Sequence, residues 1–122
     1  MPSVLLVEDD ADLAELLAEL FVGVGWVVHS ERNGNDALRS LNAARPDVIV
    51  TDCMMPQMDG RELIDRLRRN PKLADIPVIM MSGASSLREG LEASGQINLR
   101  KPFDPDALIE LARQLLPGPR NT

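Results

Sequence analysis

Residues 48–60 of the chain read Val48-Ile-Val-Thr-Asp-Cys-Met-Met-Pro-Gln-Met-Asp-Gly60. The run Val48–Val50 that opens this stretch is wholly apolar, which is typical of a strand buried on both faces of a parallel sheet. Asp52 follows the run almost at once, and Asp59 is placed to cap a helix with apolar positions between residues 63 and 67. The stretch therefore predicts a buried strand, an acidic loop and the start of a helix.

The same alternation of short apolar runs and helical segments recurs along the whole chain. Strands are predicted at Val4–Val7, Trp26–His29, Val48–Val50, Val78–Met81 and Ile97–Leu99. Apolar residues at helical spacing predict helices through Leu13, Leu16, Leu17, Leu20 and Val24, through Ala37, Leu38 and Leu41, through Leu63, Ile64 and Leu67, and through Leu108, Leu111, Ala112, Leu115 and Leu116. A further helix is expected around Leu87 and Leu91, although nearby glycines weaken its propensity.

This order of elements predicts an α/β fold. Strands that alternate with helices form a doubly wound parallel sheet with helices on both faces, because right-handed crossovers place the helices there. The expected fold is the flavodoxin-like (βα)5 type, with five parallel strands in the order 2-1-3-4-5. Residues 1–122 are expected to form one domain, with a core at about 3–116 and a tail at 117–122.

Composition narrows the class of function. The formal net charge is −6, so direct binding of nucleic acid is not expected, because that surface would need to be basic. No apolar run approaches the roughly 20 residues that a membrane helix needs, and the N-terminus does not have the pattern of a signal peptide. Cys53 is the single cysteine, which fits a reducing compartment, and the expected location is the cytoplasm.

Polar residues follow the ends of four predicted strands. Glu8, Asp9 and Asp10 follow the first strand, Asp52 the third, Ser82 the fourth and Lys101 the fifth. Because ligands bind doubly wound sheets at the carboxyl ends of the strands, these side chains are expected to converge. Clustered carboxylates attract a cation, and Mg²⁺ prefers oxygen ligands. Asp52 could then act as a nucleophile toward a phosphoryl group, with Ser82 and Lys101 binding its oxygens.

Each of these residues has a simpler interpretation when it is taken alone. An acid at a strand end is usually a helix cap or a solvated loop residue, and that interpretation is kept for Asp10. Cys53 is interpreted as a small core residue and His29 as a structural residue. Five polar residues in register with the strand ends are much harder to explain in that way.

Four segments resemble the receiver domain of bacterial response regulators. The most specific is Asp52-Cys-Met-Met-Pro-Gln-Met-Asp-Gly60, which is similar to the phosphoacceptor loop of that family. Val4-Leu-Leu-Val-Glu-Asp-Asp10 resembles its first strand and acidic pair, and Pro77-Val-Ile-Met-Met-Ser82 its fourth strand. Lys101-Pro-Phe103 resembles a turn in which the peptide bond before proline is usually cis. The resemblance runs from about residue 3 to residue 116.

The resemblance implies a role for each matched position. Asp52 is the expected phosphoacceptor. The expected Mg²⁺ ligands are Glu8, Asp9, Asp52 and the main-chain carbonyl of Met54. The residues expected to sense the phosphoryl group and to switch are Ser82, Asn98, Lys101 and Pro102. The implied partners are a sensor histidine kinase or phosphotransfer protein, which donates the phosphoryl group, and an unknown downstream protein target. The domain is expected to be a signalling phosphoacceptor and not an enzyme.

The sequence departs from the family pattern in three ways. Asn98 stands where receivers often carry an aromatic switch residue, and the chain has no Tyr. The spacing from Ser82 to Lys101 is short, so the fourth helix is expected to be short or displaced. Met54 and Ala84 stand at two positions that flank the path of hydrolytic water. Because neither can orient water by a strong hydrogen bond, slow loss of the phosphoryl group is expected.

Other interpretations remain open from the residues. A phosphatase of the haloacid dehalogenase type also uses an aspartate nucleophile and Mg²⁺, but it needs a second aspartate where this chain has Met54. A dinucleotide-binding domain would need a G-x-G-x-x-G motif after the first strand, and that motif is absent. The chain could also be a receiver within a hybrid kinase or within a regulator that has an output domain.

Overall fold

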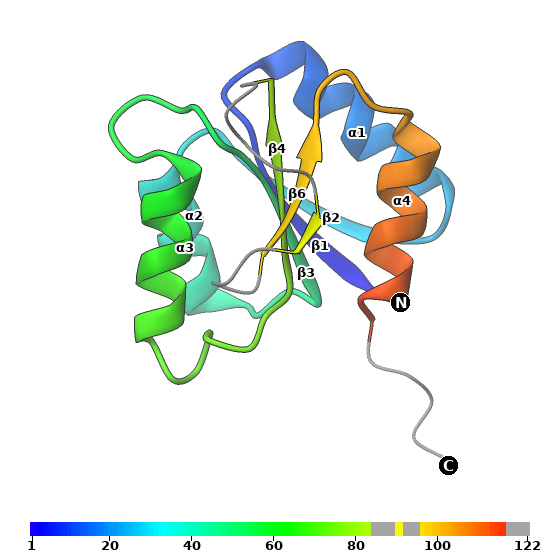
Figure 1. The fold of residues 1–122 in the computed structure, drawn as a ribbon. Helices are drawn as coiled ribbons and strands as arrows, with labels where there is room; N and C mark the ends of the chain where they lie inside the picture. Colours follow the sequence, from blue (N-terminus) through cyan, green and yellow to red (C-terminus); the bar gives the residue numbers. More distant parts are fainter. Residues whose placement is uncertain (84–89, 92–95, 117–122) are drawn as a thin grey trace.

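The computed structural model describes residues 1–83, 90–91 and 96–116. The strands are β1 (Ser3–Val7), β2 (Val27–Glu31), β3 (Val48–Asp52), β4 (Val78–Ser82), β5 (Gly90–Leu91) and β6 (Ile97–Arg100). The helices are α1 (Ala11–Gly23), α2 (Gly34–Ala43), α3 (Gly60–Arg69) and α4 (Pro105–Gln114). Figure 1 shows a central sheet with α1 and α4 on one face and α2 and α3 on the other.

The sheet has the order β2-β1-β3-β4-β6-β5. Its first five members pair in parallel, which confirms the predicted order 2-1-3-4-5, with β6 as the fifth parallel strand. The sheet has one further member that was not predicted, because β5 adds two residues antiparallel to β6 at the edge. A two-residue strand is too short to leave a periodic signal in the sequence.

Two apolar cores lie on the two faces of the sheet. Alternate residues of β1 enter opposite cores: Leu5 packs toward α2 and α3, and Leu6 packs toward α1 and α4. All residues of β3 and β4 are buried, as expected for central strands that are covered on both faces. None of the helices among the described residues has the length and apolar character needed to span a membrane.

The buried face of α1 differs from the prediction. The helix buries Ala14, Leu17 and Phe21, whereas Leu16 is 48% exposed and Val24 lies beyond the last turn and is exposed. Leu13 and Leu20 are half-buried. Phe21 determines the orientation, because its ring packs edge-on against the buried ring of Trp26 at a centroid distance of 5.1 Å.

The prediction for the segment between β4 and β6 is wrong at one residue. Leu91, expected in a helix, lies in β5. Leu87, the other residue on which this helix prediction rested, lies outside the described residues, as does Ala84. The prediction of five helices is therefore confirmed for four.

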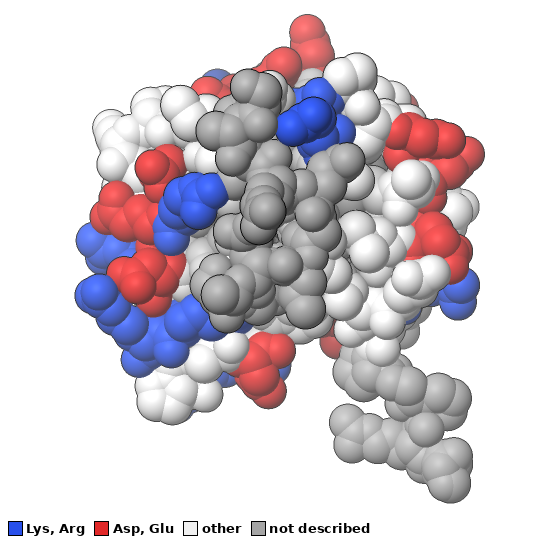
Figure 2. Space-filling view, viewed as in Figure 1, with Lys and Arg blue, Asp and Glu red and all other residues white. Residues whose placement is uncertain are grey.

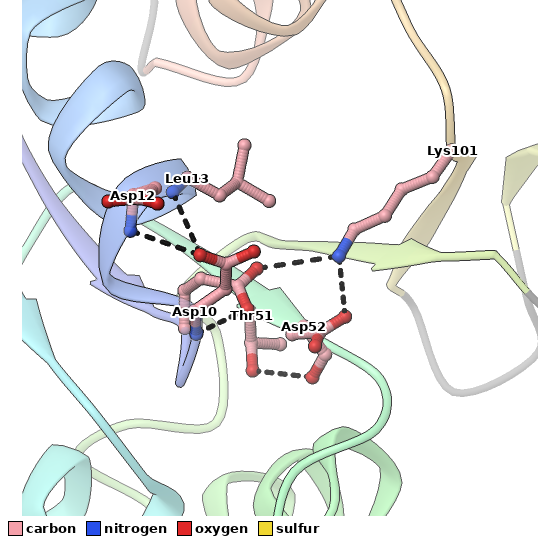
Figure 3. A network of polar contacts seen from close by, with 7 residues as sticks. Asp10, Asp12, Leu13, Thr51, Asp52 and Lys101 are labelled. Atoms are coloured by element: carbon pink, nitrogen blue, oxygen red, sulfur yellow. Dashed lines mark hydrogen bonds and ion pairs between the residues drawn. The ribbon is translucent and has the colours of Figure 1, made fainter.

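The predicted helix caps are confirmed. The Asp10 carboxylate accepts hydrogen bonds from the backbone N–H groups of Asp12 and Leu13, as Figure 3 shows. Asp59 caps α3, also as predicted. Asp104 caps α4 in front of Pro105 in the same way. These caps fix where each helix begins, and thus where the loops at the carboxyl ends of the strands lie.

Candidate functional site

The strand ends bring the predicted acids to one rim of the sheet. Glu8 and Asp9 directly follow β1, and Asp52 is the last residue of the neighbouring strand β3. Carboxylate oxygens of all three residues lie within 4.8 Å of one another. The structure therefore assembles the three carboxylates that the sequence placed at this rim.

The three acids differ in their access to water. Asp9 is exposed, whereas the side chains of Glu8 and Asp52 are only 1% and 10% exposed. Glu8 Oε2 accepts a hydrogen bond from the backbone N–H of Asp10 at 3.1 Å. Two negative groups are thus held close together in a region from which most water is excluded, and this arrangement is costly without a cation.

Lys101, which directly follows β6, places its ammonium group beside two of these carboxylates. Its Nζ lies 3.2 Å from Asp52 Oδ1 and 3.5 Å from Glu8 Oε1. Figure 3 shows the side chain reaching from the end of β6 toward Asp52. These contacts join residues 49 and 93 positions apart in the sequence, so only the folded sheet creates them.

The pKa values reflect this crowding. The pKa of Glu8 is raised to about 7, mainly because burial disfavours the charged carboxylate, and the charge of Asp52 acts in the same direction. The Asp10 N–H group and Lys101 oppose this rise without cancelling it. Burial tends to lower the pKa of Lys101, but the carboxylates of Asp52 and Glu8 outweigh burial and raise it. One lysine therefore does not fully compensate the acids.

The backbone that carries Asp52 is closely supported, which sequence reasoning did not foresee. The buried Thr51 hydroxyl donates a hydrogen bond to the Asp52 carbonyl at 3.0 Å (Figure 3). A Cβ at Gly60 would lie 2.5 Å from that same carbonyl oxygen, so the first turn of α3 can approach only as glycine. The backbone N–H of Gly60 also donates to the Cys53 carbonyl at 2.8 Å. The sequence signal was the Asp59-Gly60 pair, which had been interpreted as a helix start and as the end of the segment that resembles the phosphoacceptor loop.

The remaining predicted residues lie where the strand pattern placed them. Ser82 ends β4 and is buried, and its carbonyl accepts a hydrogen bond from the Lys101 backbone N–H at 2.7 Å. Asn98 is buried in β6, and the Lys101–Pro102 peptide bond is cis, as the resemblance implied. Met54 lies in the loop after β3 with its side chain 69% exposed. The switching role of these residues and the metal-binding role of the Met54 carbonyl stay predictions.

Cys53 and His29, which were interpreted as structural residues, lie where that interpretation expects them. Cys53 is buried, and burial raises the pKa of its thiol, so it lacks the ready thiolate of a reactive cysteine. His29 lies on β2, at the edge of the sheet and away from the acids.

The donor set of the rim fits a hard divalent cation. Glu8, Asp9 and Asp52 offer carboxylate oxygens only, and Mg²⁺ is typically bound by one or two carboxylates together with water. The exposure of Asp9 leaves a side of the cluster open to water and to an incoming ligand. The chain therefore carries the ligand chemistry that a magnesium site requires.

Comparison with known proteins identifies relatives of this chain. Residues 4–113 match the family described as the response regulator receiver domain. The chain is 34% identical to the probable transcriptional regulator ycf29 of Porphyra purpurea, over 93% of this chain and 56% of that protein. The chain spans about half the length of the first curated relatives that it matches.

Solved structures show the same likeness. The receiver domain of a signal transduction histidine kinase from Syntrophus aciditrophicus has a TM-score of 0.87 and 33% identity, covering 100% of this chain and 95% of that one. The chemotaxis response regulator CheY4 of Vibrio cholerae has a TM-score of 0.85 and 30% identity, covering 95% of this chain and 99% of that one. The likeness in both sequence and fold thus extends over nearly the whole domain.

Proposed function

The chain belongs to the response regulator receiver domain family, and from this premise we propose that Asp52 is its phosphoacceptor. The observation that carries the proposal is the convergence of Glu8, Asp9 and Asp52 with an ammonium group 3.2 Å from Asp52 Oδ1. In the proposed reaction a carboxylate oxygen of Asp52 attacks the phosphorus atom of a phosphohistidine or a small phosphodonor. The bond from phosphorus to the donor breaks, and the donor leaves with the electron pair.

The residues around Asp52 are proposed to stabilise charge, donate hydrogen bonds and position the carboxylate during this transfer. Lys101 holds positive charge beside the attacking carboxylate and can pair with an oxygen of the transferred group. The Ser82 hydroxyl, at the end of the adjacent strand, is proposed to donate a hydrogen bond to another of those oxygens. Thr51 and Gly60 fix the peptide that follows Asp52, so its carboxylate starts from a defined position.

Magnesium is the proposed cofactor of the site. Glu8, Asp9, Asp52 and the Met54 carbonyl would hold the ion, which would neutralise negative charge on the incoming phosphoryl group. The fit rests on three carboxylates that share one rim although a single lysine only partly compensates them. The same residues argue against a haloacid dehalogenase-type phosphatase, because the thioether of Met54 cannot transfer a proton.

The setting of the domain follows from its relatives as a proposal. The chain is proposed to act beside an output segment, within a hybrid kinase or as a separate regulator, and the proposed location is the cytoplasm. The first of these settings fits the finding that the chain spans about half the length of the first relatives. The relatives include a protein named as a hybrid signal transduction histidine kinase in Dictyostelium discoideum. A sensor histidine kinase or phosphotransfer protein is the proposed donor, and a protein is the proposed downstream target. The acidic domain itself is not expected to bind nucleic acid.

Chemical labelling tests the proposal directly. Incubation with acetyl phosphate and Mg²⁺ should add the mass of one phosphoryl group to the protein, and the peptide that carries it should contain Asp52. Asp52→Asn should abolish the added mass, whereas Asp10→Asn, which alters only the cap of α1, should be labelled normally. Efficient labelling of the Asp52→Asn protein would contradict the assignment.

A further inference from the structure

The outer edge of β2 carries backbone groups that the sheet does not use. Among the described residues β2 pairs with β1 alone. Val27 and Glu31, the first and last residues of β2, both make their backbone hydrogen bonds on the β1 side. Because successive residues of a strand direct these groups to opposite sides, the N–H and C=O groups of Val28 and Ser30 face away from the sheet. Ser30 and the neighbouring His29 are exposed, so this edge is open to a further strand.

Apolar side chains gather where this edge begins. Val22, Val24 and Val27 are 59%, 57% and 46% exposed, and all three lie in residues 22–27, where the end of α1 turns into β2. Single exposed valines are ordinary, whereas several in one short segment mark a surface that burial against a partner would stabilise.

A hollow of 140 Å³ lies beside the same edge on the face covered by α2. Its lining includes Leu5 of β1, Val27 and His29 of β2, and Ala44 at the end of α2. A strand added to the sheet would run about 4.8 Å from β2, and alternate side chains of that strand would point to this face. One of them could therefore enter the hollow beside Val27, and a volume of this order accommodates an apolar group of about the size of benzene.

Helix α1 flanks the edge on the other face. Glu15, Ala18 and Val22 follow one another at helical spacing and so lie on one stripe of α1. Ala18 and the edge residue Val28 both pack against the core on this face of the sheet. The stripe therefore runs along β2, and its exposed carboxylate, Glu15, lies on the side of the free edge.

Charge selects what can add to this edge. Residues 1–31 contain seven Asp or Glu residues and no Lys or Arg. On the face of α2, Arg45 lines the hollow but is paired with Asp75. Figure 2 shows mainly acidic side chains on the side formed by α1 and α4, and acidic and basic side chains next to one another on the side formed by α2 and α3. A basic segment is thus attracted to the α1 side of the edge, and a second copy of this acidic region is repelled.

We propose that the free edge of β2 binds an extended segment of another protein, which adds a strand to the sheet and carries apolar residues alternating with Lys or Arg. Backbone hydrogen bonds to Val28 and Ser30 hold the segment. Its apolar side chains enter the hollow and cover Val27, and its basic side chains face Glu15 while their alkyl stems cover Val22. Asp52 takes no part, because it ends β3, which β1 separates from β2.

Two short capped peptides, one alternating leucine with lysine and the other leucine with glutamate, test the partner's charge and the location. Titrated into the isotope-labelled protein, the lysine peptide should shift the amide resonances of β2 and slow hydrogen exchange of the Val28 and Ser30 amides, because new hydrogen bonds protect them. The glutamate peptide should bind more weakly by about tenfold or more. Equal binding of the two peptides, or changes confined to other surfaces, would overturn the proposal.

Matched variants test the backbone edge itself. Ser30→Pro removes an outward N–H group without removing a hydrogen bond of the sheet, and it should weaken binding of the lysine peptide by about tenfold. Ser30→Ala keeps the N–H group and should bind as the native protein does. Equal binding by these two variants would overturn the proposal.

A second pair of variants does not depend on a proline within a strand. Val27→Lys places a positive charge at the edge and should weaken binding of the lysine peptide by about tenfold. Leu16→Lys adds the same charge at an exposed position on the flank of α1 that faces α4, and it should have little effect. Equal losses in the two variants would overturn the proposal.

The Asp52→Asn protein keeps this proposal separate from the phosphoacceptor assignment. It should bind the lysine peptide with unchanged affinity, and Ser30→Pro should be labelled by acetyl phosphate as the native protein is. Loss of peptide binding in Asp52→Asn would place the peptide at the acidic rim and overturn the assignment to β2. Dimers of the free native protein in sedimentation, if Ser30→Pro abolishes them, would also overturn the proposal, because a second copy would then cover the edge.

Discussion

Charged side chains on α2 and α3 are paired within one helix, whereas those at the rim are brought together from distant parts of the sequence. On the two helices, Arg39 pairs with Asp36, Arg66 with Glu62 and Arg69 with Asp65, three or four residues apart on exposed surface. At the rim, Glu8 follows β1, Asp52 ends β3 and Lys101 follows β6. The two acids are buried, and Lys101 is half-buried. Local pairs need only one helix, whereas the rim cluster needs the whole sheet.

This contrast separates charges that solvate a surface from charges that bind a ligand. An exposed pair on one helix contributes roughly 0.3–0.5 kcal/mol, because water screens it. Buried acids have lost that screening, and the raised pKa of Glu8 shows that the fold holds its carboxylate in an unfavourable environment. A fold tolerates such a cost where a bound cation removes it. The comparison therefore predicts large effects at the rim and small ones on α2 and α3.

The largest effect is expected for the metal. Asp9→Ala should weaken Mg²⁺ binding about 100-fold, because it removes a carboxylate oxygen from the cluster and even indirect ligand partners are worth 10–100-fold. Asp10→Ala is the matched control, since Asp10 caps α1 and should change stability more than affinity. Calorimetry is the measurement. Trp26 fluorescence is not expected to report metal binding, because Trp26 lies before β2, at the opposite end of the sheet from the acids. Equal losses in the two variants would show that Asp10, too, binds the metal.

The next effect concerns pH and stability without metal. Folding raises the pKa of Glu8 from 4.5 to about 7, so the folded state binds this proton more tightly than the unfolded state. In the presence of a chelator, the contribution of Glu8 to the free energy of unfolding should therefore be fully present below pH 4.5 and should be lost as the pH rises through about 7. The loss should be on the order of 3 kcal/mol, since the pKa rises by about 2.5 units and one pKa unit is worth about 1.4 kcal/mol.

Glu8→Gln should flatten this pH dependence, because the amide keeps a neutral polar group in the same place. Urea unfolding of both proteins at several pH values is the measurement. Parallel pH profiles for the two proteins would show that another group causes the dependence. Added Mg²⁺ should restore stability at neutral pH in the native protein and should restore it less in the variant.

A smaller effect is expected for the lifetime of the phosphorylated state. Met54, two residues after Asp52, has an exposed side chain whose thioether cannot orient the attacking water by a strong hydrogen bond. Met54→Asn combined with Ala84→Glu should speed hydrolysis on the order of tenfold, because each change adds a polar group at a predicted flank of the water path. Met54→Leu is the control and should not accelerate the decay. Mass spectrometry follows the loss, and reset of the native protein within seconds would contradict the mechanism.

The positions of the site residues could be predicted from the sequence because each one marks the end of a strand. Asp52 and Ser82 follow wholly apolar runs, and a parallel sheet brings such ends to one rim. The bridge from Lys101 to Glu8 and the contact of Gly60 with the Asp52 carbonyl depend on separations in space that no local pattern encodes. These contacts had to come from the structure.

Errors arose where one pattern allowed two answers. Apolar residues surround much of α1, so the spacing of Leu16 and Val24 was as helical as that of Leu17 and Phe21, and packing against Trp26 decided between them. Leu91 had helical spacing from Leu87, yet it pairs with β6 as an edge strand. In both cases tertiary contacts outweighed the local period.

The smallest effect is expected on α3, and it tests the other side of the comparison. Arg69 Nη2 lies 2.9 Å from Asp65 Oδ2, and the two side chains are 77% and 56% exposed. Arg69→Gln should change the free energy of unfolding by less than about 0.5 kcal/mol, and the double variant with Asp65→Asn should show almost no coupling between the two residues. Neither change should alter Mg²⁺ affinity or labelling by acetyl phosphate, because both side chains are exposed and water screens their charges from the rim. Urea unfolding over a range of salt gives the coupling energy. A coupling above 1 kcal/mol that persists at high salt would mean that exposed local pairs stabilise this fold as strongly as the buried cluster does, and the distinction between the two regions would be lost.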